Sequence, residues 1–83
     1  MTIRVRLFAA IRETLGRETL EMTLAEGATA EEVWAELLRL DPTGALAARR
    51  RNLAAAVNRR YAKFDAPLTE GDEVVFIPPV SGG

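Results

Sequence analysis

The chain lacks the side chains on which most catalytic and metal centres depend. Its 83 residues contain no cysteine and no histidine. Without cysteine there is no thiolate nucleophile, no zinc–thiolate site and no disulfide framework. Without histidine the commonest general base and metal ligand is missing, so a hydrolase triad cannot be assembled in its usual form. We therefore expect that this chain alone is not an enzyme and that it binds no metal.

Long hydrophobic runs and an excess of one charge are also absent. The longest apolar stretches fall far short of the roughly 20 residues that a membrane-spanning helix needs, and Arg4 and Arg6 interrupt any N-terminal signal segment. Eleven basic and 12 acidic side chains give a net charge of −1, which favours neither nucleic acid nor a membrane surface as partner. We expect one cytoplasmic domain over residues 1–83.

What the sequence does contain is an unusual C-terminal tail, Pro78-Pro79-Val80-Ser81-Gly82-Gly83. Neither proline donates a backbone hydrogen bond, so the preceding strand should end at Ile77. A Pro-Pro pair favours the extended polyproline II conformation, in which six residues reach about 20 Å. Gly82 and Gly83 have no Cβ atom and fit a channel only as wide as the backbone. These features favour insertion of the tail into another protein's active site; a frayed terminus is the alternative.

Hydrophobic periodicity predicts two strands and a helix in the first half of the chain. Residues 2–8 and 19–24 alternate with period two, which predicts a hairpin whose long connection, 9–16, holds a short helical turn or loop. Thr29 and Glu32 have the spacing of a capping box, and an apolar stripe then predicts a helix that ends before Asp41. Trp34 lies on this stripe and is expected to fill the core. A weaker helical stretch is predicted at 43–51, where three arginines should stay solvated.

Three further strands are predicted in the second half, at 53–57, 61–64 and 73–77, with turns at 58–60 and 70–72. The last strand is apolar on both faces from Val74 to Ile77, which is typical of a strand in the middle of a sheet. We expect it to lie beside the first strand and parallel to it, with one main helix packed on one face. This α+β arrangement, with a mixed sheet of about five strands, is the ubiquitin-like β-grasp fold.

The same alternation predicts an apolar patch on the uncovered face of the sheet. Phe8, Val75 and Ile77 have the opposite parity to the core positions of their strands, and Tyr61 lies in a short strand that can join them. Uncovered apolar patches usually mark binding surfaces, and aromatic anchors carry much of an interface's energy. We predict that Phe8, Tyr61, Val75 and Ile77 dock a partner near the root of the tail. The alternative is that they are ordinary half-buried sheet residues.

The chemistry of the tail also requires partners. A terminal carboxylate is ionised at pH 7 and is a poor electrophile, so it needs activation, most simply as an acyl-adenylate made with ATP. No lysine or arginine follows Lys63. This indicates that the cationic side chains that bind ATP and a phosphorylated substrate, and the site for Mg²⁺, belong to partner proteins. We expect no cofactor bound by this chain itself.

Several segments resemble the small subunit of molybdopterin synthase, a family of ubiquitin-like sulfur carriers. They are the ending from Phe76 to Gly83, the stretch Leu53-Ala54-Ala55-Ala56-Val57-Asn58, the turn Gly71-Asp72-Glu73-Val74 and the opening Val5-Arg6-Leu7-Phe8-Ala9. The resemblance covers essentially the whole chain. It implies that an ATP-dependent activating enzyme adenylates Gly83, which then becomes a thiocarboxylate. The sulfur is passed to cyclic pyranopterin monophosphate, and two such transfers form the dithiolene of molybdopterin.

The resemblance also implies the partners. The large synthase subunit forms a heterotetramer with the carrier, receives the tail and holds the catalytic side chains. The family's interface positions correspond to Phe8, Tyr61 and Ile77, although its members often have an aliphatic residue in place of Tyr61 and an aromatic one in place of Ile77.

Other functions stay open at this point. The carrier could serve thiazole synthesis or tRNA thiolation, but those relatives tend to be shorter and to lack Pro-Pro before the glycines. Gly83 could form an isopeptide bond with a target lysine, as in a ubiquitin-like covalent modifier. The chain could also be an interaction domain with an inert terminus.

Overall fold

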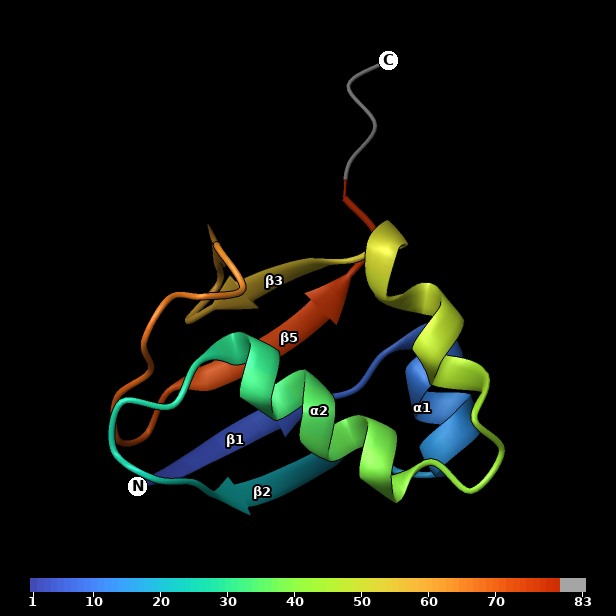
Figure 1. Cartoon of the computed structure of the whole chain (residues 1–83), viewed down its shortest axis with the longest axis horizontal. Coiled ribbons are helices and arrows are strands. Elements are labelled where there is room, and N and C mark those ends of the chain that lie inside the picture. Colours follow the sequence, from blue (N-terminus) through green and yellow to red (C-terminus); the bar gives the residue numbers. More distant parts are fainter. Residues whose placement is uncertain (80–83) are drawn as a thin grey trace.

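The computed structural model describes residues 1–79, so our expectations for Val80, Ser81, Gly82 and Gly83 lie outside the described residues. The described part forms one five-stranded sheet with strand order β2-β1-β5-β3-β4 (Figure 1). The strands are β1 (Thr2–Arg6), β2 (Thr19–Thr23), β3 (Ala54–Val57), β4 (Arg60–Ala62) and β5 (Glu73–Ile77). β5 runs parallel to β1, and the other neighbouring pairs are antiparallel. The predicted central position of the last strand is confirmed.

Three helical segments accompany the sheet. They are α1 (Ala9–Leu15), α2 (Ala30–Leu40) and the 3₁₀ helix η1 (Ala45–Asn52). Figure 1 shows α2 in front of the sheet, whereas α1 and η1 lie near the end at which β1 and β5 finish. The start of α2 is fixed by the predicted capping box: the Glu32 N–H donates to Thr29 Oγ1 at 3.4 Å, and the Thr29 N–H donates to Glu32 Oε2 at 3.0 Å. These bonds satisfy donors that the first helical turn would otherwise leave unpaired.

The core lies between α2 and one face of the sheet. Ile3 and Val5 of β1 and Val74 and Phe76 of β5 are buried against the apolar stripe of α2. Trp34 is 2% exposed, and its ring meets the Phe76 ring edge-on with 5.3 Å between centroids. The predictions that Trp34 fills the core and that odd-numbered residues of β1 face the helix are confirmed.

The β3–β4 hairpin differs from the sequence prediction. The turn consists of Asn58 and Arg59 alone, both with positive φ (52° and 69°), and Arg60 already pairs with Val57. The expected turn at 58–60 and strand at 61–64 were therefore wrong by one to two residues. A two-residue turn with positive φ matches the twist of the paired strands, and Asn tolerates this conformation. Phe64 lies beyond β4, where its ring stacks on the Phe76 ring with 5.6 Å between the centroids.

The arginine triplet at 49–51 also differs in part from expectation. Arg49 and Arg51 are exposed, as predicted. Arg50 instead places its guanidinium 3.3 Å from the centroid of the Phe64 ring and donates two hydrogen bonds, of 2.8 and 3.2 Å, to the Glu31 carboxylate. The hydrogen bonds from Arg50 lower the pKa of Glu31 below its ordinary value. The contact ties η1 to the start of α2, which the sequence pattern did not indicate.

Candidate docking surface at the root of the tail

The uncovered face of the sheet is organised by the central strand β5. Val74 and Phe76 are buried under α2, and Val75 and Ile77 are half-buried on the other face, as predicted. In the strand register Val75 lies opposite Arg6 of β1 and Ala56 of β3, and Ala56 lies opposite Tyr61 of β4. Because opposite residues of neighbouring strands share a face, these side chains form one row across the uncovered sheet.

All four residues of the predicted patch line one hollow on this face. The hollow has a volume of about 420 Å³, and its lining residues are Arg6, Phe8, Ala56, Arg59, Tyr61, Glu73, Val75 and Ile77. Phe8 is 41% exposed and Tyr61 is 60% exposed, which is unusual for aromatic side chains of this size. Strand parity therefore brought the correct four residues together. Their role in docking stays a prediction.

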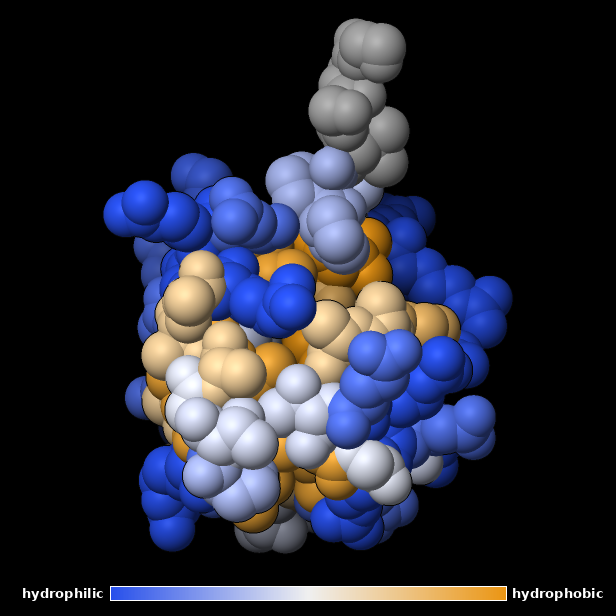
Figure 2. Space-filling model, turned by 90° about the vertical axis from the view of Figure 1, so that its right-hand side faces the viewer, coloured by the Kyte–Doolittle hydropathy of each residue, from blue (hydrophilic) through white to orange (hydrophobic). Residues whose placement is uncertain are grey.

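Two backbone features fix the position of the hollow. β5 ends at Ile77, and Pro78 and Pro79 follow it exposed and outside any strand, as expected for residues without an N–H donor. Phe8 is the N-cap residue of α1, where its carbonyl accepts hydrogen bonds from the N–H groups of Ile11 and Arg12. The backbone of Phe8 is thus held while its ring stays accessible. Figure 2 views the end of the molecule at which α1 and η1 lie, and hydrophobic side chains are exposed there below the point where the described chain ends.

Four lining residues of the hollow were not part of the predicted patch: Arg6, Ala56, Arg59 and Glu73. Strand parity already placed Arg6 on the face of Phe8, and the same rule applied from Tyr61 would have found Ala56. The placement of Arg59 at the hollow depends on the length of the turn between β3 and β4. The Arg6 guanidinium lies 5.5 Å from the centroid of the Phe8 ring, a cation–π contact that packs a charge against the apolar lining.

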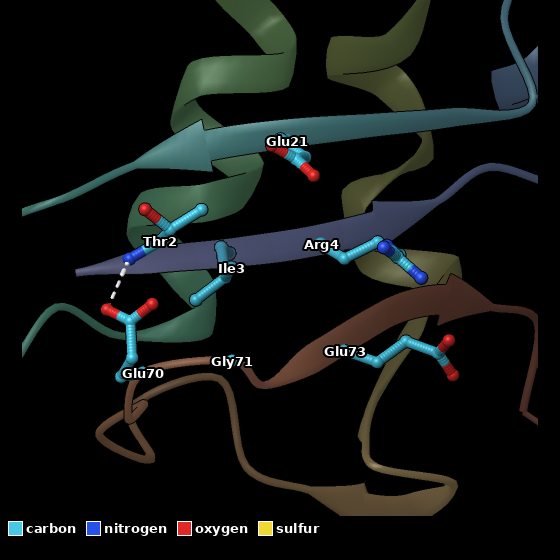
Figure 3. A pocket seen from close by; sticks show the side chains of 7 residues that line it. All are labelled: Thr2, Ile3, Arg4, Glu21, Glu70, Gly71 and Glu73. Atoms are coloured by element: carbon cyan, nitrogen blue, oxygen red, sulfur yellow. Dashed lines mark hydrogen bonds between the residues drawn. The ribbon is translucent and has the colours of Figure 1, made fainter.

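A second, polar hollow of about 320 Å³ lies beside the first and shares Glu73 with it. Figure 3 shows its lining residues, which are Thr2, Ile3, Arg4, Glu21, Glu70, Gly71 and Glu73. The Thr2 N–H donates to Glu70 Oε1 at 2.8 Å and so joins the loop before β5 to the start of β1. Arg4 lies opposite Glu21 of β2 and Glu73 of β5 in the register. This hollow therefore places three carboxylate side chains around a single arginine.

Within residues 1–79, no group of three or more carboxylates is placed to hold a metal ion. Over the same range, none of the helices is both long enough and apolar enough to cross a membrane.

Comparison with known proteins places the chain in a family. The ThiS family model matches residues 5–83 of the chain. The chain belongs to the ThiS family. It is 42% identical over 81 residues to the molybdopterin synthase sulfur carrier subunit of Escherichia coli (strain K12), covering 98% of this chain and 99% of that protein. It is 35% identical over 85 residues to the protein of the same description from Chlamydomonas reinhardtii, covering 100% of both. The family resemblance inferred from the sequence is confirmed.

Solved structures agree with this membership. SAMP1 from Haloferax volcanii has a TM-score of 0.81 at 26% identity, with 100% of both chains covered. A chain from the protein–protein complex of subunits 1 and 2 of molybdopterin-converting factor from Helicobacter pylori has a TM-score of 0.66 at 27% identity, again with 100% of both covered. A ubiquitin from Caldiarchaeum subterraneum, at 20% identity, covers 100% of this chain and 98% of that chain with a TM-score of 0.57 and shows the fold alone. The ubiquitin-like β-grasp fold is thereby confirmed.

Proposed function

We propose that this chain is the sulfur carrier and small subunit of a molybdopterin synthase. The observation that carries the proposal is the similarity to a molybdopterin synthase sulfur carrier subunit. The two proteins are 42% identical, and the match covers 98% of this chain and 99% of that protein. The tail belongs to the matched region, because the family model extends to residue 83. Gly83 is then the position that carries the sulfur.

The reaction at Gly83 needs two steps on partner proteins. In the first, the terminal carboxylate attacks the α-phosphorus of ATP, bound with Mg²⁺ by an activating enzyme, and pyrophosphate leaves. In the second, the outer sulfur of a persulfide attacks the acyl carbon and AMP leaves, which gives an acyl disulfide. A thiol then attacks the donor's sulfur, forms a disulfide with it and releases the thiocarboxylate. Adenylation is required because a carboxylate ionised at pH 7 resists nucleophiles. This chain contributes the acyl group alone, which fits a sequence with neither cysteine nor histidine.

The charged carrier then meets the large synthase subunit. The hollow around Phe8, Tyr61, Val75 and Ile77 is the docking surface in this proposal, since it lies at the root of the tail and keeps two aromatic rings accessible. Pro78, Pro79, Val80, Ser81 and Gly82 span the distance from this surface to the active site of the partner. There the thiocarboxylate sulfur is transferred to cyclic pyranopterin monophosphate, and catalytic side chains come from the large subunit. The Helicobacter pylori complex of subunits 1 and 2 supports an assembly of this kind.

Intact-mass measurement tests the proposal. The chain is incubated with ATP, Mg²⁺, a cognate activating enzyme and a sulfide source. We expect the mass to rise by the difference between one sulfur and one oxygen atom, and we expect a variant that lacks Gly83 to keep its original mass. An unchanged mass of the full chain would contradict the proposal. In a carrier-deficient cell, a variant with one alanine added after Gly83 should fail to restore cofactor synthesis.

A covalent protein modifier is the second candidate function. It is favoured by the likeness to SAMP1 from Haloferax volcanii, a small archaeal modifier protein, at 26% identity. The same activated Gly83 would then be attacked by a lysine ε-amine and form an isopeptide bond. Mass spectrometry of cellular proteins for lysines that carry a Gly-Gly remnant from this chain distinguishes the two functions.

A further inference from the structure

Two arginines of β1 on the same face of the sheet have opposite surroundings. Arg4 lies between Glu21 and Glu73 in the strand register, so carboxylates flank it on both sides (Figure 3). Arg6, two residues further along, lies between Thr19 and Val75. Glu18 lines a smaller neighbouring hollow together with Arg6, but no ion pair involving Arg6 forms within residues 1–79. Arg4 thus has an acidic residue directly opposite it on each side, whereas neither residue directly opposite Arg6 is acidic.

Arg59 is a second unmatched cation at the rim of the same hollow. It lies in the two-residue turn with φ of 69°, a conformation that is costly for a residue other than glycine. The preceding Asn58 fixes this turn: its side chain donates to Asp72 Oδ1 at 2.8 Å and accepts from the Glu73 N–H at 3.0 Å. Arg59 is therefore presented at the hollow by a braced backbone. No ion pair to Arg59 is found among the residues that the structure describes.

The remaining charge of the hollow, Glu73, does not balance both arginines. Glu73 lies directly opposite Arg4 in the parallel ladder. The hollow thus combines an apolar lining with two cations, Arg6 and Arg59, for which no ion pair is found between residues 1 and 79. Unpaired charges at the edge of an apolar contact cost desolvation free energy when a partner covers them, unless the partner brings opposite charges. Carboxylates on the partner offset this cost and so favour docking.

We infer that Arg6 and Arg59 recognise carboxylate groups that flank an apolar anchor side chain on the docking partner. The inference rests on the proposed function and names the chemistry of the surface that the large subunit presents. A second copy of this chain is a poor occupant, because a two-fold contact through this face would bring two further arginines to the same region. An acidic rim around an apolar anchor fits both the lining and the charge. The two arginines then determine which large subunit is accepted.

The test compares two neighbouring arginines of the hairpin. Arg59→Glu reverses a charge at the hollow, and Arg60→Glu makes the same charge change at an exposed residue that does not line it. Arg60 alternates with Tyr61 along β4 and so projects from the opposite side of the strand. Binding of each variant, and of the unchanged chain, to the large synthase subunit from the same organism is measured by calorimetry at low and high salt. Circular dichroism checks that both variants are folded.

We expect Arg59→Glu to weaken binding by about 10-fold or more, because like charges across an interface repel, and Arg60→Glu to change it by less than about 2-fold. The difference should shrink as salt is raised from about 0.05 to about 0.5 M, since salt screens charges near the surface. Arg6→Gln, which keeps a polar side chain but removes the charge, should also weaken binding, with a smaller salt dependence.

Equal affinities of the Arg59→Glu and Arg60→Glu variants, or an effect of Arg59→Glu that is independent of salt, would overturn the inference while the proposed function stands. If the unchanged chain does not bind the large subunit, the proposed function and the inference both fail. If Arg59→Glu is unfolded, Arg6→Gln decides alone: an affinity equal to that of the unchanged chain contradicts carboxylate recognition.

Discussion

Substitutions at two adjacent residues of β5 should have different effects, one on the stability of the domain and the other on docking. Phe76 is 2% exposed and meets Trp34 edge-on at 5.3 Å and Phe64 in a stack at 5.6 Å. Replacing it by alanine removes these contacts and leaves a cavity, which costs about 3–5 kcal/mol. Each kcal/mol lowers the Tm of a domain of this size by about 4–8 °C, so Phe76→Ala should lower the Tm by about 12–40 °C. Thermal unfolding followed by circular dichroism measures this shift.

Ile77 is half-buried on the opposite face and lines the hollow. Its replacement by glutamate leaves the core intact, so we expect a change in unfolding free energy of at most about 1 kcal/mol. Docking should weaken by about 2 kcal/mol, or about 30-fold in Kd, because the carboxylate enters an apolar contact. Phe8→Glu should behave in the same way. Calorimetric titration with the large subunit gives the Kd.

A matched control is Thr23→Glu, which adds the same charge at an exposed position of β2 outside the hollow. It should leave both Tm and Kd close to those of the unchanged chain. The assignment of faces is refuted if Ile77→Glu unfolds the domain as Phe76→Ala does. The docking role of the hollow is refuted if Ile77→Glu and Thr23→Glu bind the large subunit equally well.

Three further outcomes concern stability. Thr29→Ala should lower the unfolding free energy by about 1 kcal/mol, measured by urea denaturation, because it removes the capping bond to the Glu32 N–H; an unchanged midpoint would contradict this. Arg59→Gly should raise Tm by a few degrees, because a φ of 69° costs a residue other than glycine about 1–2 kcal/mol, whereas glycine adopts it without strain. A lower Tm would show that the turn is not strained. Hydrogen bonds from the N–H of Leu46 and from Thr43 lower the pKa of Asp41, so its contribution to stability is present above the unfolded pKa of about 3.9 and is lost as pH falls through the folded pKa. Urea titrations across this range should show a weaker pH dependence for Asp41→Asn, and an identical dependence would exclude Asp41 as a cause.

Much of the fold follows from local sequence rules. The strands near the N-terminus, the helix with its Thr29–Glu32 capping box and the end of β5 before Pro78 were all predicted, because alternation, capping and missing N–H donors act over a few residues. The central, parallel position of β5 followed from its apolar character on both faces. The function was also inferred from the sequence, through the resemblance of several of its segments to a known family.

The tertiary structure decided the features that depend on contacts between distant segments. Whether the hairpin turn after β3 has two residues or three depends on how β3 pairs with β4, and this choice places Arg59 at the hollow. Arg50 was expected in solvent, but packing brings it against Phe64 and Glu31. Likewise, Arg4 and Arg6 are equivalent in an alternating pattern, and only the strand register shows that acidic residues lie directly opposite Arg4 on both sides and directly opposite Arg6 on neither. Local periodicity fixes which face a side chain occupies, whereas its neighbours on that face are fixed by pairing between strands far apart in the chain.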